Sequence, residues 1–346
     1  MKLQDLPIIE QLQLLRITPD SQIPPHQFLF TWNGTPCFAK AELVAVTGKA
    51  KSGKTYLNSI LMAAAAANHN LLGLKRIEEN PLRIVWIDTE QSNDTTCEIL
   101  RDRITAMTGN KPDDELFHVF NLRQVRWQDR LTLVLSTIAI CKPDLVIFDG
   151  IRDVVGDINS YEEAQSVITQ LLCIASEYKP CIVCVLHQNK AIEDKTLRGA
   201  LGSELQNKSF ETYECSKNSD TNIFTIKQTA TRKYDLPNRI DFCLSDDGIP
   251  MLCAVPVKTE ATFNPDFMTE GKIDKAKLFS HVLQTKAMTW SELREHIMKT
   301  ANIRSTHFAE TLISEARDSG LLMTILNNGN RMYALQRQKQ LFDQDT

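Results

Sequence analysis

The residues of this chain most suited to chemistry lie together in the segment 48–55, which has the pattern G-x-x-x-x-G-K-[ST]. In such a loop the backbone N–H groups surround the phosphates of a nucleotide, and the glycines allow a path that Cβ atoms would obstruct. The lysine reaches the β- and γ-phosphates, and the hydroxyl that follows it binds Mg²⁺. We therefore predict a site for ATP and Mg²⁺ formed by Gly48, Lys49, Ala50, Lys51, Ser52, Gly53, Lys54 and Thr55.

The sequence on each side of the loop supports this prediction. Residues 41–48 form a short apolar run suited to a buried strand, and residues 55–67 are rich in strong helix formers. A helix that begins at the end of the loop directs the partial positive charge of its N-terminus at the phosphates. The alternative is a surface turn rich in glycine and lysine, which the flanking strand and helix disfavour.

A second candidate for metal chemistry is Asp149, near the end of an apolar run over residues 144–150. In nucleotide-hydrolysing enzymes of the phosphate-loop class, an acid at the end of a buried strand holds Mg²⁺. Thr55 and Asp149 are therefore the predicted metal-binding pair. Alternatively, Asp149 only opens the turn that follows its strand, an interpretation that the nearby phosphate loop weakens.

Glu90 is the candidate for activating water. It ends a clear strand pattern over residues 82–90, and residues 117–122 form a further strand candidate before Asp149. A strand inserted between the two motif strands is typical of ATPases that place a glutamate beside the γ-phosphate, where it orients and deprotonates the attacking water. The alternative is that Glu90 caps the helix that starts near Ser92.

Other nucleotide-binding classes fit the sequence less well. Asn189 and Lys190 resemble the start of an Asn-Lys-x-Asp motif, but Ile192 stands in the position of the Asp that selects guanine. The sequence also lacks the LSGGQ-like signature of transporter ATPases. Both observations favour an ATPase outside these two classes.

Three strand ends together resemble the RecA-like ATPase core: residues 88–90 (Asp-Thr-Glu), Asp149 and residues 185–188 (Val-Leu-His-Gln). Within that class the chain is similar to the RepA-type and DnaB-type hexameric helicases of plasmids, phages and mobile elements. Residues 151–160 resemble the RepA-type continuation, and the similarity covers roughly residues 40–255. The resemblance implies an Mg²⁺-dependent ATPase that acts on DNA as a homo-oligomer, with a hexamer expected.

The resemblance also implies roles for residues later in the chain. His187 and Gln188 lie where such enzymes place a polar sensor of the γ-phosphate, although a locally bonded strand end is the alternative. Arg232 is the first candidate for the basic residue that reaches the ATP of a neighbouring subunit. In RecA-like motors the loop at residues 189–207 faces a central channel and grips single-stranded DNA, and a plain solvated loop is the alternative. The candidate phosphate contacts of that loop are Lys190, Lys195 and Arg198.

Near the C-terminus the sequence pattern becomes helical. A short helical pattern at residues 275–283, a capping box at residues 289–292 and a later helix from residue 305 or 306 predict three helices. Asn-Gly between the runs 321–326 and 331–335 predicts a hairpin after them. That order describes a winged helix-turn-helix, whose third helix enters the major groove of duplex DNA. From residue 272 on, 11 Lys/Arg against 8 Asp/Glu are compatible with DNA binding, and docking of a protein is the alternative. The candidate DNA contacts here are Arg304, His307 and Arg331.

Composition bounds the class of protein. The chain has 346 residues, of which 42% are hydrophobic and 24% charged, with a net charge of −4 and nine cysteines. This length favours two domains. Scattered cysteines within strand patterns indicate reduced thiols, and Cys181 and Cys184 should face opposite sides of a strand rather than share a metal. Because the N-terminal residues lack a signal-peptide pattern and no apolar run is long enough to cross a bilayer, we expect a cytoplasmic protein with no membrane partner.

These observations predict one architecture and function. The expected α/β fold is a RecA-like P-loop NTPase core, with a mostly parallel sheet, helices on both faces and antiparallel strands at the C-terminal edge, followed by a C-terminal winged helix-turn-helix domain. The expected function is an oligomeric helicase or translocase in replication or mobilisation of a plasmid or mobile element. Two alternatives are an ATP-gated DNA-binding regulator or recombination accessory, and an ATPase unrelated to DNA. The expected segments are an N-terminal extension (1–40) with a hairpin at Asn33-Gly34, the ATPase domain (41–255), a linker (256–271), the winged helix (272–336) and a polar tail (337–346).

Overall fold

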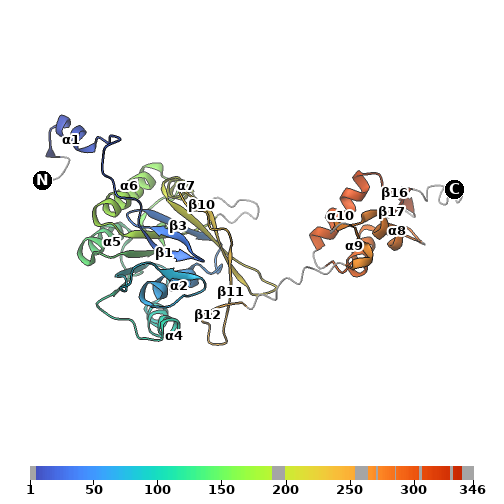
Figure 1. Cartoon of the computed structure of the whole chain (residues 1–346), viewed down its shortest axis with the longest axis horizontal. Helices are drawn as coiled ribbons and strands as arrows, with labels where there is room; N and C mark the ends of the chain where they lie inside the picture. Colours follow the sequence, from blue (N-terminus) through green and yellow to red (C-terminus); the bar gives the residue numbers. More distant parts are fainter. Residues whose placement is uncertain are drawn as a thin grey trace. The chain divides into compact units, whose positions relative to one another are not determined.

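Short runs rich in Val, Ile, Leu and Phe form the central sheet of the first of two structural units, as expected for strands that are buried on both faces. The computed structural model describes residues 5–188, 199–253, 264–269, 272–284, 286–303, 306–327 and 330–336. The chain divides into two compact units, residues 1–253 and 254–346, which are described separately (Figure 1).

The described strands of the central sheet follow the order β12-β11-β10-β9-β3-β8-β7-β5-β6. The strands from β9 to β6 are parallel to one another, and β10, β11 and β12 extend the sheet in antiparallel fashion. The predicted α/β fold with a large, mostly parallel sheet is thereby confirmed. The strands are β3 (Leu43–Gly48), β5 (Ile84–Asp88), β6 (Phe117–Asn121), β7 (Leu145–Asp149), β8 (Cys181–His187), β9 (Glu211–Lys217), β10 (Phe224–Thr231), β11 (Ile240–Leu244) and β12 (Pro250–Leu252).

The register of the parallel strands brings their carboxyl ends to one edge. Gly48 at the end of β3 is paired with His187 at the end of β8, and Asp88 of β5 is paired with Asp149 of β7. Asp149 in turn lies opposite Val185 of β8. Residues that are far apart in the sequence therefore meet where the phosphate loop begins.

One expectation about strand order is wrong. The sequence interpretation placed the strand of Glu90 between the two motif strands, but β8 lies between β3 and β7, and β5 lies on the far side of β7. Connecting helices carry the chain across the sheet, so the order of strands in the sequence does not fix their order in space. Glu90 follows the end of β5 and still reaches the site because that strand end is paired with β7.

Helices cover both faces of the central sheet (Figure 1). Buried residues of α2 share one apolar cluster with Cys181, whereas residues of α5, α6 and α7 share the other cluster with Cys184. The two cysteines thus face opposite sides of β8, as predicted. The helices of the first face are α2 (Lys54–Ala66), α3 (Asn93–Glu98), a π-helix (Ile99–Ile104) and α4 (Thr105–Thr108), and those of the second are α5 (Trp127–Cys141), α6 (Tyr161–Tyr178) and α7 (Gly199–Lys208).

The N-terminal hairpin packs on the central sheet of the first unit. Strands β1 (Phe28–Trp32) and β2 (Thr35–Ala39) are joined at Asn33-Gly34, both with positive φ, and β4 (Leu74–Arg76) pairs with β1. The hairpin predicted from Asn-Gly is therefore present. Phe38 stacks on Tyr213 of β9 with ring centroids 4.8 Å apart, and Glu211 accepts hydrogen bonds from the Phe38 N–H at 2.9 Å and the Tyr213 hydroxyl at 2.6 Å.

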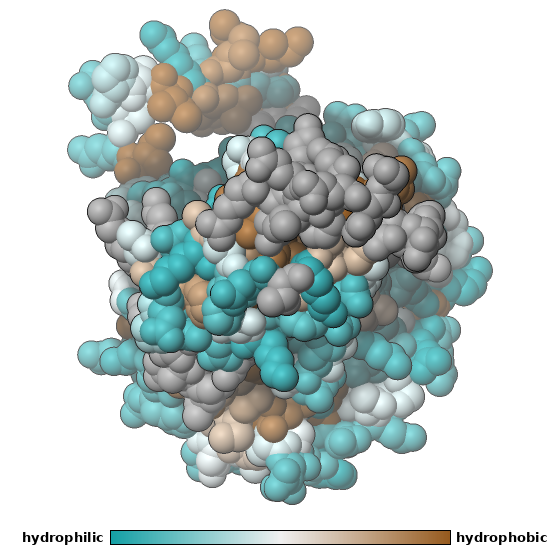
Figure 2. Space-filling model, turned by 90° about the vertical axis from the view of Figure 1, so that its right-hand side faces the viewer, coloured by the Kyte–Doolittle hydropathy of each residue, from teal (hydrophilic) through white to brown (hydrophobic). Residues whose placement is uncertain are grey.

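Helix α1 (Ile8–Leu15) precedes this hairpin and buries none of its residues. Large apolar side chains on this helix are widely exposed, including Ile8 at 75% and Leu14 at 68%. Among the coloured residues that face the viewer in Figure 2, hydrophilic ones predominate and apolar ones lie between them in separate groups. None of the helices in the described parts of the chain is both long enough and apolar enough to cross a membrane.

In its described residues the second unit has three α-helices followed by a hairpin, as the sequence pattern predicts. Thr289 and Glu292 form the expected capping box at the start of its second helix. The sheet has the order β15-β17-β16, and its hairpin strands are antiparallel. The elements of this unit are a 3₁₀ turn (Pro265–Phe267), β13 (Met268–Thr269), β14 (Lys272–Ile273), α8 (Lys275–Val282), β15 (Met288–Thr289), α9 (Trp290–Thr300), α10 (Thr306–Asp318), β16 (Leu322–Asn327) and β17 (Asn330–Leu335).

Replacement of Glu211 tests how the hairpin is held on the sheet. Glu211 is 2% exposed, so Glu211→Ala leaves two buried donors without their acceptor and is expected to lower the free energy of unfolding of the first unit by about 2–4 kcal/mol. Glu211→Gln keeps an acceptor oxygen and should cost less. Urea denaturation measures both variants beside Glu115→Ala, a change at an exposed glutamate. Equal midpoints for Glu211→Ala and Glu115→Ala would refute this account.

Candidate active site

The phosphate loop at residues 48–55 joins β3 to α2 and depends on its two glycines. A Cβ atom on Gly48 would collide with the carbonyl oxygen of Cys215 and with Ser52 Oγ. Gly53 has φ of 101°, and a Cβ there would lie 2.7 Å from the ring of Phe224. Only glycine accommodates both approaches, which confirms the backbone argument made from the sequence.

Lys54 is the central cation of the site. Its side chain is buried, and Nζ donates to the carbonyl oxygens of Gly48 at 3.2 Å and Lys49 at 2.9 Å. Nζ also lies 3.1 Å from His187 Nδ1. Burial lowers the pKa of Lys54, and the nearby negative charge of Asp149 acts in the opposite direction.

His187 connects Lys54 to Glu90. An ammonium group only donates hydrogen bonds, so His187 Nδ1 accepts from Lys54 and the ring proton resides on Nε2. His187 Nε2 lies 3.2 Å from Glu90 Oε1 and therefore donates to it. This hydrogen bond, opposed by desolvation, lowers the pKa of Glu90. Glu90 is consequently held as a carboxylate at neutral pH.

The backbone of Glu90 is fixed by the preceding acid. Asp88 Oδ1 accepts the N–H groups of Glu90 at 3.1 Å and Gln91 at 3.0 Å, while its Oδ2 accepts the hydroxyl of Thr96 at 2.6 Å. The cap of α3 is Ser92, whose side chain accepts the N–H of Thr95. The alternative in which Glu90 caps this helix is therefore excluded.

Asp149 carries the most perturbed carboxylate of the site. It is 3% exposed, and burial raises its pKa to about 7, with further contributions from the negative charges of Glu90 and Asp88. Lys54 and a hydrogen bond from Asn58 act in the opposite direction. Asn58 Nδ2 donates to Asp149 Oδ2 at 2.9 Å.

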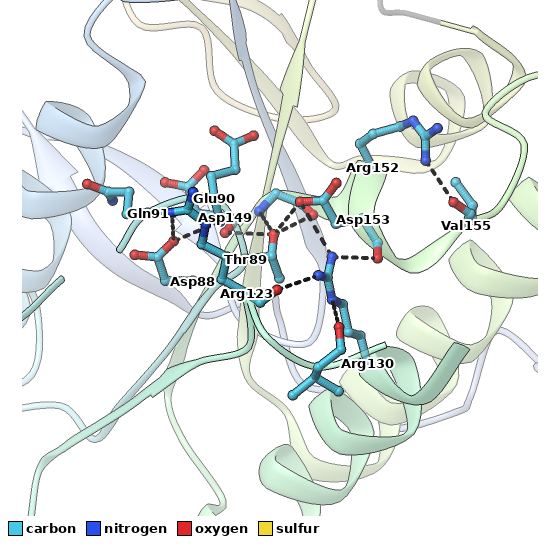
Figure 3. A network of polar contacts seen from close by, with 12 residues as sticks. Asp88, Thr89, Glu90, Gln91, Arg123, Arg130, Asp149, Arg152, Asp153 and Val155 are labelled. Atoms are coloured by element: carbon cyan, nitrogen blue, oxygen red, sulfur yellow. Dashed lines mark hydrogen bonds and ion pairs between the residues drawn. The ribbon is translucent and has the colours of Figure 1, made fainter. Parts of the chain in front are cut away.

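Thr89 joins the strand ends that carry Glu90 and Asp149. Its Oγ1 accepts the N–H of Gly150 at 2.9 Å and donates to Asp153 Oδ2 at 2.8 Å (Figure 3). Arg130 of α5 closes this network by donating to the carbonyl oxygen of Asp153 at 3.1 Å. The positions of the two acids relative to each other are thus fixed by a chain of hydrogen bonds that the sequence analysis did not anticipate.

These groups surround a cavity of about 360 Å³. Its volume lies within the range of pockets that bind small molecules such as nucleotides. The loop, Glu90, Asp149 and His187 form its polar part, and Tyr56, Phe224 and Leu244 add apolar side chains. The residues present fit a nucleotide with Mg²⁺: Ser52 Oγ is buried with no hydrogen-bond partner among the described residues, and Thr55 and Asp149, whose side chains carry the oxygens that Mg²⁺ prefers, line the same cavity.

Gln188 lies close to this site but is bonded locally. Its backbone N–H donates to the carbonyl oxygen of Gly48 at 3.3 Å, and its Nε2 donates to Glu214 Oε1 of β9 at 3.0 Å. The structure therefore brings Glu90, Asp149 and His187 to the loop, whereas the Gln188 amide is directed to β9, which lies on the other side of β3.

Arg232 lies at the opposite edge of the sheet from the phosphate loop. β10 runs antiparallel to β9, so the end of β10 lies beside the start of β9, where Thr231 pairs with Glu211. Arg232 directly follows Thr231. Its guanidinium donates to the carbonyl oxygens of Asn207 at 2.8 Å and Ser209 at 3.1 Å, next to the end of α7. Arg232 therefore takes no part in the site of its own chain.

The remaining predicted contacts are distributed differently. Arg331 is an exposed residue of β17 in the second unit. The backbone of His307 lies in α10, and the structure does not describe its side chain. The other candidates lie outside the described residues, namely Lys190, Lys195, Arg198 and Arg304.

The fold and the loop define a P-loop protein of the NTP-hydrolysing class. A family model described as an AAA domain matches residues 18–192, just over half of the chain, and the chain belongs to this family. The domain is of the P-loop ATPase type found in helicase-like proteins. Comparison with curated proteins gave no match.

Asp149→Asn tests the electrostatics of the buried acid. A raised pKa means that the folded state favours the protonated acid. The free energy of unfolding therefore decreases as the pH rises from the pKa of Asp in the unfolded chain, about 4, through the pKa of Asp149 in the folded protein, about 7. We expect the neutral variant to be more stable than the wild type at pH 8, by about 2–4 kcal/mol, and the difference to vanish near pH 4.

The measurement is thermal unfolding of nucleotide-free protein between pH 4 and pH 8. Asp247→Asn, at an exposed turn between β11 and β12, is the control and should change little across this range. A wild type that is as stable as Asp149→Asn at pH 8 would contradict the account.

Proposed function

We propose that this protein is an Mg²⁺-dependent ATPase with a RecA-like core that acts on DNA as an oligomeric helicase or translocase, resembling RepA-type and DnaB-type enzymes. The observation that carries the ATPase is the continuous path Lys54–His187–Glu90 beside the phosphate loop, with distances of 3.1 and 3.2 Å. It links the residue that binds the terminal phosphate to the residue that activates water. Replication or mobilisation of a plasmid or mobile element is the proposed setting, in the cytoplasm.

Each residue of the site has a proposed chemical role. Lys54 and the loop N–H groups bind the phosphates, and Thr55 and Asp149 hold Mg²⁺, which when bound neutralises phosphate charge. Glu90, ionised because its pKa is lowered, accepts the proton of the attacking water. His187 donates to Glu90 and accepts from Lys54. Because Lys54 is the proposed partner of the γ-phosphate, loss of that phosphate changes the hydrogen bonds of Lys54 and, through His187, those of Glu90. Gln188 is the second proposed sensor, through its backbone bond to Gly48.

Action on DNA is proposed from the domain type and from the motifs that resemble those of helicases. The second unit has three helices and a hairpin, and we assign residues 272–336 to a winged helix that contacts duplex DNA through Arg304, His307 and Arg331. Lys190, Lys195 and Arg198 are the proposed contacts to single-stranded DNA in a central channel. A ring, expected to be a hexamer, forms that channel.

Arg232 remains the proposed finger for the ATP of the next subunit. It lies at the opposite edge of the sheet from its own phosphate loop, so only the site of another copy is left for it to serve. Its side chain already donates to two carbonyl oxygens, and this holds the guanidinium in place. Lys233 and Lys227 are the second choices.

A specific feature of the second unit favours the alternative of an ATP-gated regulator or recombination accessory. Glu310 and Glu315 of α10 form ion pairs with Arg294 at 3.0 Å and Lys275 at 2.7 Å. These acids reduce the positive potential available for DNA and suit docking of a protein. Under this alternative ATP controls assembly without unwinding.

Steady-state ATP hydrolysis with and without single-stranded DNA tests the proposal. We expect hydrolysis by the wild type, stimulation by single strands, and loss of both in Lys54→Ala, because this variant removes the phosphate-binding cation. Unwinding of a forked duplex should then require ATP and fail with a non-hydrolysable analogue. Hydrolysis that no DNA affects would refute the motor and favour an ATPase unrelated to DNA.

A further inference from the structure

Asn58 is an unusual residue at its position in α2. It is 0% exposed in a helix whose neighbouring buried residues are mostly apolar, such as Leu57 and Ile60. Burial of an amide is costly unless its hydrogen bonds are satisfied. Asn is also a weak helix former, so local stability gives no reason for it.

The hydrogen bonds of Asn58 are directed at one partner. Nδ2 donates to Asp149 Oδ2 at 2.9 Å, and Oδ1 has no partner among the described residues. The ionised form of Asp149, which is the form that can bind a cation, only accepts hydrogen bonds, so the NH₂ group of the amide faces Asp149 in that form. The hydrogen bond to Asp149 is therefore the contact that compensates for the burial of the Asn58 amide, whose Oδ1 has no partner among the described residues.

The position of Asn58 relative to the phosphate loop explains the contact. Lys54 and Asn58 are four residues apart in one helix and so share a face, and Thr55 lies three residues before Asn58. The first two turns of α2 thus supply the phosphate-binding cation, the hydroxyl of the metal pair and the donor to its carboxylate. A neutral donor orients Asp149 without adding a positive charge that would oppose a cation.

We propose that Asn58 is a positioning residue for Mg²⁺: by holding Asp149 Oδ2, it would leave Oδ1 as the oxygen available to the ion, beside the Thr55 hydroxyl. This inference rests on the proposed function of the site. Asn58 is fully buried and is not among the residues that line the cavity, so it acts on the site through its hydrogen bond to Asp149.

The test measures how strongly Mg²⁺ enhances ATP binding, which needs no hydrolysis. Calorimetric titration gives the ATP affinity in Mg²⁺ and in EDTA for the full chain and for Asn58→Leu, whose side chain has the same number and branching of heavy atoms and no donor. We expect the enhancement by Mg²⁺ to fall about tenfold, the size of one hydrogen bond to a charged group. The affinity in EDTA should stay unchanged, because Lys54 and the loop remain.

Two further variants separate positioning from packing. Asn58→Ser keeps a donor, and Asn58→Ala leaves room for a water molecule, so both should retain more of the Mg²⁺ enhancement than Asn58→Leu. A packing role predicts the reverse order, because leucine fills the volume best. Ser59→Ala is the matched control: Ser59 is equally buried in α2 but donates to the carbonyl oxygen of Thr55, and its loss should leave the enhancement as in the wild type.

The outcomes distinguish this inference from the proposed function. Wild-type binding that Mg²⁺ enhances, together with an equal enhancement in Asn58→Leu, overturns the role of Asn58 and leaves the ATPase proposal standing. If Asn58→Leu does not fold, Asn58→Val, which also lacks a donor and fills most of the space, replaces it, and an equal enhancement in Asn58→Val and the wild type overturns the role in the same way. Wild-type protein that binds no ATP with Mg²⁺ overturns both.

Discussion

The site depends on the balance between one buried ammonium and three carboxylates at neighbouring strand ends. Asp88, Glu90 and Asp149 come together because β5 and β7 are paired in register, and Lys54 lies beside them. Like charges in a poorly solvated place repel strongly unless each is hydrogen-bonded. Here each acid has its own donors: backbone N–H groups for Asp88, His187 for Glu90 and Asn58 for Asp149. Burial and the charges of Glu90 and Asp88 nevertheless raise the pKa of Asp149 to about 7. A divalent cation would offset these negative charges, so the site is suited to one.

The antiparallel part of the sheet supports the same site from the other side. Cys215 of β9 and Phe224 of β10 lie against the two glycines of the loop, closer than any Cβ atom would allow. The cavity is in turn bordered by Phe224 and Leu244 from β10 and β11. Movement of these strands would therefore change the shape of the phosphate loop. The conformation of the loop thus depends on residues far beyond the motif that identifies it.

Much of the site is predictable from the sequence, because its parts are local patterns. The loop, Asp149, Glu90 and His187 each lie at the end of an apolar run, and the structure places all four around one cavity. The hairpin at Asn33-Gly34 also follows from two residues that tolerate positive φ. Strand order was not predictable, because helices separate consecutive strands and the sequence does not say which side of β7 receives β5.

Contacts between distant segments were likewise beyond the sequence. Asn58 looks like a polar residue in an apolar helix, and its meaning depends on Asp149, which follows much later in the chain. Thr89 lies between two acids of the motif, yet its bonds to Gly150 and Asp153 require the pairing of β5 with β7. Arg232 could be recognised as a basic residue after a strand, but the direction of β10 decides at which edge of the sheet it lies.

The central claim is that Glu90 activates water in a site assembled by Lys54, Asp149 and His187. The most direct measurement compares ATP turnover and Mg²⁺-ATP binding in the wild type and Glu90→Gln, whose amide is similar in size and has no basic oxygen. The account predicts turnover at least about 100-fold lower, as expected for loss of a general base, with unchanged nucleotide affinity. Full turnover in Glu90→Gln would contradict it.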